Sequence, residues 1–120
     1  MNKKLLILIL VGIIVLGAAV FIISKNISPQ NKIILFYGEN CPFCQKVEDF
    51  IKENKIEEKV PFERKEVFNN EKNAQELIEK AKICELDAAD IGVPFLWDGS
   101  KCFVGDTDII NFFKQKTGIQ

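Results

Sequence analysis

The fold is decided by one short part of the chain, residues 33–51, which read IILFYGENCPFCQKVEDFI. The apolar run at its start ends at Gly38, which predicts a short buried strand over residues 32–37. From Pro42 onward, apolar residues recur at the i, i+3, i+4 spacing among charged ones, which predicts an amphipathic helix. Two cysteines with two residues between them therefore stand where a strand gives way to a helix.

A C-x-x-C pair in this setting is typical of a thiol–disulfide active site. Cys41 is predicted at the N-cap and Pro42 at the first helical position, where the missing N–H of proline costs nothing. The unpaired N–H groups and the positive end of the helix favour the thiolate of Cys41 over its thiol. Cys44 lies one turn on, on the apolar face, and is expected to be more buried. Cys41 is therefore the candidate catalytic nucleophile and Cys44 the candidate resolving thiol.

Other uses of these two cysteines stay open. A four-cysteine zinc site would need a second C-x-x-C, but Cys84 and Cys102 are 18 positions apart and the chain has no histidine. The pair could instead be a purely structural bridge or a soft-metal clamp for copper(I). A binding module with this fold and little turnover is a further alternative. We expect no resident metal and no cofactor.

The rest of the chain predicts alternating strands and helices. The predicted segments are a charged edge strand at 60–68, a helix at 70–84, a strand at 93–97, a tight turn at Asp98-Gly99, a return strand at 101–104, and a last helix capped by Asp106 or Thr107. The element order is β-α-β-α-β-β-α. We expect one domain over residues 32–120.

Composition excludes several classes of function. All 17 acidic residues lie after position 38, and 13 of the 16 basic residues lie beyond residue 25, so the region after residue 25 carries a net charge of −4. This balance argues against nucleic acid as a partner. The absence of histidine excludes Ser-His-Asp and Cys-His catalysis and histidine metal sites.

The N-terminus carries an uncharged apolar run at residues 5–23. At about 1.5 Å per residue it would span roughly 28 Å, which predicts an uncleaved transmembrane signal-anchor. The lysines before it predict a cytoplasmic tail at residues 1–4, followed by the anchor, a linker at 24–31 and an extracytoplasmic catalytic domain. A cleaved signal peptide is the alternative. The predicted location is thus a single-pass protein of a cell membrane, in keeping with a bacterial envelope.

At this point the sequence resembles the thioredoxin-like fold, and specifically the glutaredoxins. The resemblance is carried by the CPFC motif, by Gly92-Val93-Pro94 and by Val104-Gly105-Asp106, and it covers residues 33–116. It implies an α/β fold with a four-stranded mixed sheet and thiol–disulfide oxidoreductase activity. It also implies that the bond before Pro94 is cis and that Pro94 shapes a groove beside the cysteines.

Departures from the glutaredoxin pattern bear on the substrate. Glutaredoxins usually carry a lysine where this chain has Gly38 or Glu39, and Thr-Val-Pro where it has Gly92-Val93-Pro94. Glutathione is therefore a poor candidate, and we expect a monomer that acts on protein thiols and disulfides. A membrane oxidase or reductase is a candidate partner in electron transport. The candidate substrate-binding residues are Tyr37, Pro42, Phe43, Val93, Pro94 and Asp106.

Cys84 and Cys102 form a second candidate pair. Four cysteines in a small domain outside the cytoplasm favour pairing, and a structural Cys84–Cys102 disulfide would join the second predicted helix to the last strand. Two free buried thiols are an alternative, because Cys84 continues the apolar stripe of its helix. An electron relay from Cys41/Cys44 to this pair is a third.

Overall fold

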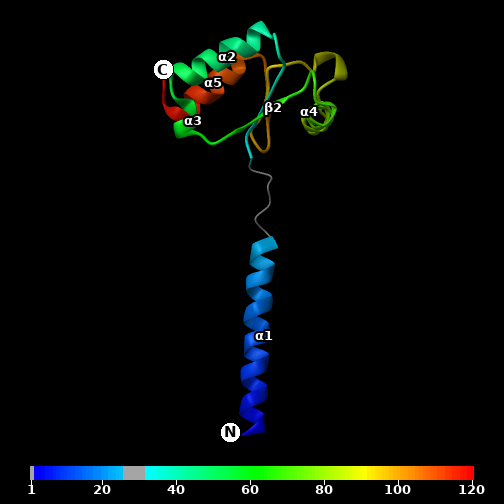
Figure 1. Ribbon diagram of the computed structural model, residues 1–120, viewed down its shortest axis with the longest axis vertical. Helices are drawn as coiled ribbons and strands as arrows, with labels where there is room; N and C mark the ends of the chain where they lie inside the picture. Colours follow the sequence, from blue (N-terminus) through cyan, green and yellow to red (C-terminus); the bar gives the residue numbers. More distant parts are fainter. Residues whose placement is uncertain (1, 26–31) are drawn as a thin grey trace.

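The computed structural model describes residues 2–25 and 32–120, with side chains described for residues 2–19, 32–87 and 89–120. The elements, in chain order, are α1 (Lys3–Lys25), β1 (Ile34–Tyr37), α2 (Pro42–Glu53), α3 (Ile56–Lys59), β2 (Glu63–Glu66), α4 (Glu71–Ile83), the 3₁₀ turn η2 (Ala88–Asp90), β3 (Phe95–Trp97), β4 (Cys102–Val104) and α5 (Asp106–Thr117). Figure 1 shows their arrangement.

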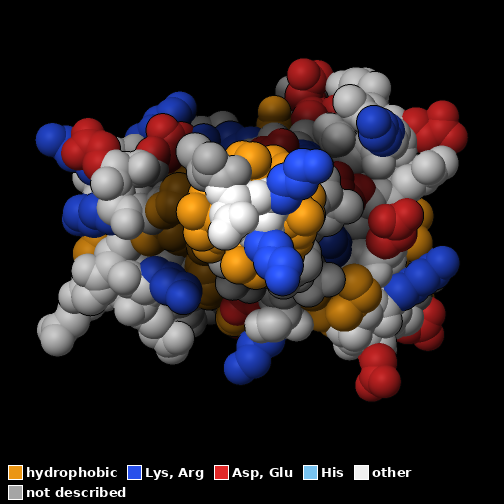
Figure 2. Space-filling view, turned by 90° about the horizontal axis from the view of Figure 1, so that it is seen from below, with side chains coloured by type: hydrophobic (Ala, Val, Ile, Leu, Met, Phe, Trp, Pro, Cys, Tyr) orange, Lys and Arg blue, Asp and Glu red, His pale blue; other side chains and the backbone are white. Residues whose placement is uncertain are grey.

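Helix α1 follows the predicted apolar run, and its large hydrophobic side chains as far as Leu16 are exposed on every side (Figure 2). The prediction that residues 5–23 span a membrane is nevertheless wrong. Within the described residues, no helix is both long enough and apolar enough to cross a bilayer.

The predictions that depend on that span are corrected with it. These are the transmembrane helix in the fold class and the single-pass membrane location with its cytoplasmic N-terminus and extracytoplasmic domain. The bounds of the predicted tail at residues 1–4, linker at 24–31 and domain at 32–120 stay predictions. Of the predicted linker, residues 26–31 lie outside the described residues, while Ser24 and Lys25 belong to α1.

The four strands form one mixed sheet in the order β2-β1-β3-β4. Strand β1 pairs in parallel with β2 and antiparallel with β3, and β3 pairs antiparallel with β4. This confirms the predicted thioredoxin-like α/β fold with a four-stranded mixed sheet. The charged strand β2 lies at an edge, as expected, because a central position would bury its charges.

Both faces of the two central strands are buried, so their sequences are apolar throughout. On one face, Leu35 and Leu96 pack against α2, α3 and α5. On the other face, Phe36 and Phe95 meet edge to face, with ring centroids 6.0 Å apart, over α4. Figure 1 shows α2 and α5 side by side on one side of the sheet and α4 on the other. The sheet therefore holds α2, and with it the cysteine pair, against a rigid core.

Some predicted boundaries differ from the structure. The strands are shorter than predicted, and the short elements α3 and η2 were not expected. Neither Asp106 nor Thr107 caps the last helix, because Gly105 is the N-cap and Asp106 is already the first helical residue. Gly105 has a φ of 90°, a conformation that residues with a Cβ rarely adopt.

Cys84 and Cys102 are joined by a disulfide, with their Cα atoms 6.2 Å apart. Cys84 is the C-cap of α4, and Cys102 is the first residue of β4. Residue 102 stands opposite Trp97 in the sheet, which is the end of β3 away from Pro94. The bond therefore joins α4 to the sheet at the Trp97 end of β3, whereas the residues beside Cys41 lie at the opposite end of that strand. Its role as a structural staple stays a prediction.

Candidate active site

A tight turn between β1 and α2 positions Cys41. The strand ends at Tyr37, and Asn40 then adopts a left-handed conformation with φ of 57°. Asparagine tolerates that conformation better than most residues. Cys41 follows in an extended conformation as the N-cap of α2, and Pro42 is the first helical residue. The local placement of both residues is as the sequence predicts.

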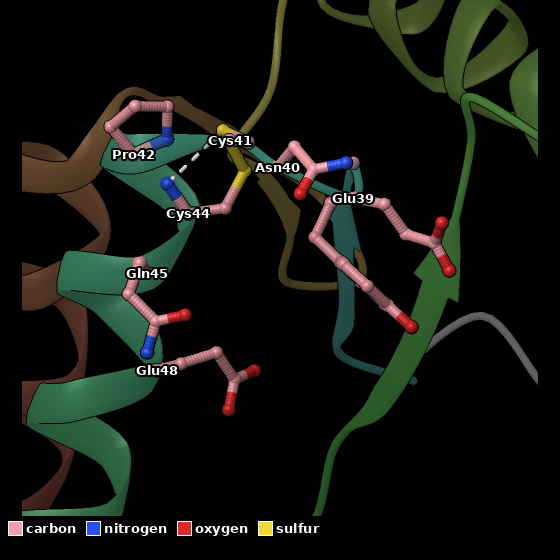
Figure 3. A pocket seen from close by; sticks show the side chains of 9 residues that line it. Glu39, Asn40, Cys41, Pro42, Cys44, Gln45 and Glu48 are labelled. Atoms are coloured by element: carbon pink, nitrogen blue, oxygen red, sulfur yellow. Dashed lines mark hydrogen bonds between the residues drawn. A yellow bond between two sulfur atoms is a disulfide. The ribbon is translucent and has the colours of Figure 1, made fainter.

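Cys41 and Cys44 are joined by a disulfide, with their Cα atoms 5.2 Å apart. The backbone N–H of Cys44 donates a hydrogen bond to Cys41 Sγ over 3.1 Å, drawn as the dashed line in Figure 3. In the dithiol form, the same N–H and the helix N-terminus would favour a thiolate at Cys41. Cys44 is only 5% exposed, whereas Cys41 is half-buried. The two sulfur atoms therefore differ in access, and Cys41 is the one that a partner can reach.

The loop before β3 lies against Cys41. The Val93–Pro94 peptide bond is cis, which confirms what the resemblance implied. The carbonyl oxygen of Val93 lies 3.8 Å from Cys41 Sγ, and Pro94 itself is buried. The carbonyl of Pro94 accepts a hydrogen bond from the Gly105 N–H over 3.0 Å. The backbone carbonyl of Val93 is thus the group of this loop that lies next to Cys41 Sγ.

A hollow of about 480 Å³ opens on one side of the disulfide. Its lining consists of Tyr37, Gly38, Glu39, Asn40, Cys41, Pro42, Cys44, Gln45 and Glu48. The hollow therefore brings together four of the predicted site residues: Tyr37, Cys41, Pro42 and Cys44. The hollow thus brings the Cys41–Cys44 disulfide together with polar side chains.

Four predicted substrate-binding residues do not line this hollow: Val93 and Pro94, which lie in the loop before β3, and Phe43 and Asp106. Phe43 is 55% exposed, and Lys46 Nζ lies 5.0 Å from the centre of its ring. Asp106 is half-buried, and its Oδ2 lies 3.7 Å from Lys46 Nζ. Whether Phe43 and Asp106 contact a substrate stays a prediction.

Glu48 is a residue of the hollow that sequence reasoning missed. Its position four residues after Cys44 places it on the same side of α2 as that cysteine. Arg64 of β2 holds its carboxylate through Nε, at 2.7 Å, and through a second nitrogen, at 3.1 Å. The pKa of Arg64 is raised above its usual value, mainly by Glu48 and to a smaller extent by Glu57 of α3, although burial acts to lower it.

In the part of the chain that is described, no three or more Cys, Asp or Glu side chains are grouped so that they could hold a metal ion.

Comparison with known proteins gives one family. The glutaredoxin family model matches residues 20–96, which include Cys41, Cys44 and Pro94. The glutaredoxin grx-1 of Archaeoglobus fulgidus has a similar fold, with a TM-score of 0.51 at 18% identity over 74% of this chain and 88% of that one. Oxidized glutaredoxin 2 of Chlamydomonas reinhardtii aligns at 20% identity over 87% of this chain and 97% of that one, with a TM-score of 0.49. No curated protein sequence matches. The family model covers well over half of the 120 residues, and on that ground the chain belongs to the glutaredoxin family.

Proposed function

We propose that this protein is a thiol–disulfide oxidoreductase that exchanges disulfides with protein partners through Cys41 and Cys44. The observation that carries the proposal is the Cys41–Cys44 disulfide at the start of α2, with one accessible and one buried sulfur. Membership of the glutaredoxin family supports the same reaction class. The catalytic unit is residues 32–120, acting as a monomer, because one chain supplies both sulfurs and the adjacent cis peptide.

The proposed reaction proceeds in two exchange steps. In the dithiol form, the Cys41 thiolate attacks a partner disulfide, forms a mixed disulfide and releases one partner thiolate. The Cys44 thiolate then attacks Cys41 Sγ, restores the Cys41–Cys44 bond and releases the second partner thiolate. Two electrons pass from the protein dithiol to the partner, and the reverse sequence oxidises a partner dithiol.

Backbone groups support each proposed step. The Cys44 N–H points at Cys41 Sγ and stabilises negative charge there when Cys41 acts as attacking or leaving thiolate. The Val93 carbonyl beside Cys41 offers a backbone acceptor to the N–H of an extended partner segment. Tyr37 and Pro42 would contact the same segment from the hollow, and Phe43 from the exposed side.

A protein disulfide is the proposed substrate rather than glutathione. Gly38 and Glu39 occupy the positions where glutaredoxins usually carry a lysine, and no basic residue lines the hollow within the described part of the chain. An anionic tripeptide therefore finds a carboxylate there instead of an ammonium group.

Insulin reduction by the full chain with a dithiol donor tests the proposal. Wild type should reduce insulin, Cys41→Ser should reduce it no faster than the donor alone, and Cys44→Ser should accumulate a mixed disulfide on Cys41. Because both variants replace a single sulfur, each is the control for the other. Equal rates for wild type and Cys41→Ser would refute the catalytic assignment and favour a binding module.

A further inference from the structure

We infer that an apolar hollow on the α4 face of the sheet receives an aliphatic or aromatic side chain of the protein partner, two or three residues from the partner's reacting cysteine. The inference rests on the proposed function and adds to it the chemistry of the substrate segment. It makes Ala74 and Ile78 residues that determine specificity, without a part in the exchange of sulfur bonds.

This second hollow, called the α4 hollow below, is lined by apolar side chains. Its volume is about 300 Å³, and its lining consists of Val67, Ala74, Leu77, Ile78 and Ile91. In the part of the chain that the structure describes, no charged or hydrogen-bonding side chain belongs to this lining. A charged or polar group placed there would lose its water without gaining a partner from these side chains. The ligand that fits the α4 hollow is therefore an apolar side chain.

The α4 hollow lies at the same end of the sheet as the reactive disulfide. The N–H of Val67 donates a hydrogen bond to the carbonyl of Tyr37 over 2.9 Å, at the end of β1 from which the chain turns toward Cys41. Ala74 and Ile78 belong to the first eight residues of α4, which begins shortly after β2 leaves the sheet at that end. A partner that reacts at Cys41 therefore passes close to the α4 hollow.

One short loop joins the α4 hollow to the reactive sulfur. Ile91 lines the hollow, and Val93, two residues further on, places its carbonyl oxygen 3.8 Å from Cys41 Sγ. The side chains of Ile91 and Val93 pack against the same buried cluster, which includes Leu77. Two residues of chain span about 7 Å at most. A partner segment that pairs with the Val93 carbonyl can thus place a side chain in the α4 hollow from two or three residues away, because an extended segment advances about 3.3 Å per residue.

Apolar side chains at this end of the sheet remain exposed. Ile78 is 42% exposed, and Phe68, the residue after Val67, is 61% exposed. The ring of Phe68 lies so close to Gly38 that a Cβ there would overlap it, and Glu66 accepts a hydrogen bond from the Phe68 N–H over 2.7 Å. Exposed apolar groups that the fold holds beside a reactive site favour a partner that covers them while it reacts.

The experiment uses the oxidised full chain, which is the form in the structure, and dithiol peptides whose first cysteine is flanked by serines. In four of the peptides, one serine two or three residues before or after that cysteine is replaced by leucine. The peptide thiolate attacks Cys41 Sγ and displaces Cys44 as thiolate. The second peptide thiol then attacks the peptide sulfur of the mixed disulfide, so the peptide gains a disulfide and both protein cysteines become thiols. Single turnovers are followed by chromatography for wild type, Ile78→Ser, Ala74→Leu and Ile83→Ser.

Ile83 is the matched control, because it is an exposed isoleucine of the same helix that does not line the α4 hollow. With wild type and Ile83→Ser, at least one leucine peptide should react about fivefold faster than the serine parent. This is less than the roughly tenfold or more that an enclosed apolar pocket gives for one methylene, because the α4 hollow is open to solvent on one side. The ratio should fall below about twofold in Ile78→Ser, which makes the wall polar, and in Ala74→Leu, which fills the hollow from within.

The outcomes separate the inference from the proposed function. A ratio near one for every leucine position with wild type, or a preference that either Ile78→Ser or Ala74→Leu retains, would overturn the inference while leaving the proposed function intact. Sedimentation velocity on the same proteins tests a different occupant. A wild-type dimer that Ile78→Ser alone dissociates would show a second copy of the chain in the α4 hollow and would also overturn the inference. If no peptide reacts with wild type, the serine parent included, the proposed function itself fails.

Discussion

Removing the Cys84–Cys102 bond should destabilise the domain by about 3 kcal/mol. The bond joins residues separated by 18 positions, and the chain-entropy relation for a loop of that length gives about 3 kcal/mol at 25 °C. The Cys41–Cys44 bond joins residues only 3 positions apart in sequence, for which the same relation gives about 1.5 kcal/mol. The double variant Cys84→Ala/Cys102→Ala should therefore lose about twice as much stability as Cys41→Ala/Cys44→Ala, its matched control.

Guanidinium unfolding of the full chain, without reductant, measures this difference. With a slope of about 2–3 kcal/mol per M for a domain of this size, the midpoint should fall by about 1 M in the Cys84/Cys102 variant and by about half as much in the control. Fluorescence of Trp97 and circular dichroism should give coincident transitions, which checks that unfolding is two-state. Each variant deletes two sulfur atoms, so losses of packing are comparable between them.

Two results would refute this reasoning. One is an equal shift of the midpoint in the two double variants, which would mean that loop length does not control the effect. The other is alkylation of both Cys84 and Cys102 in the unreduced protein, which would show two free thiols. A relay would appear differently, as loss of turnover at Cys41 when Cys84 and Cys102 are replaced.

Two further predictions concern turns at either end of the sheet. Burial acts to raise the pKa of Asp98, but hydrogen bonds from the backbone N–H groups of Lys101 and Ser100 and from the Ser100 hydroxyl lower it below its usual value. The folded pKa of Asp98 therefore lies below the unfolded one, so this stabilisation is present above about pH 4 and is lost as the pH falls through the folded pKa. Unfolding midpoints measured from pH 6 to 2 should fall more steeply for wild type than for Asp98→Asn. Parallel curves for the two proteins would contradict the assignment. At the other end, a Cβ on Gly38 would overlap the ring of Phe68, but that ring is 61% exposed and can turn away, so Gly38→Ala should cost no more than about 1 kcal/mol in denaturant unfolding. Most of that cost should disappear in a Phe68→Ala background, and strictly additive losses would argue against the overlap.

The sequence by itself determined the fold class and the position of the cysteine pair. The apolar run and the period-3.6 pattern within residues 33–51 are local, and so is the preference of proline for the first helical position. These features were sufficient to predict Cys41 at the N-cap and Cys44 on the buried face, where the structure places them. The charged edge strand was predictable for the same reason.

Only the tertiary structure decided which residues surround the sulfur atoms. The hollow joins Glu48 of α2 to Glu39 of a separate turn, and Arg64 reaches Glu48 from a strand 16 residues away. The Val93 carbonyl approaches Cys41 across 52 residues of chain. Such contacts depend on the order of strands in the sheet and on the packing of α2 against it, and no local periodicity encodes them. The apolar run at residues 5–23 shows that composition alone can also mislead, because it predicted a membrane span that the described helix does not support.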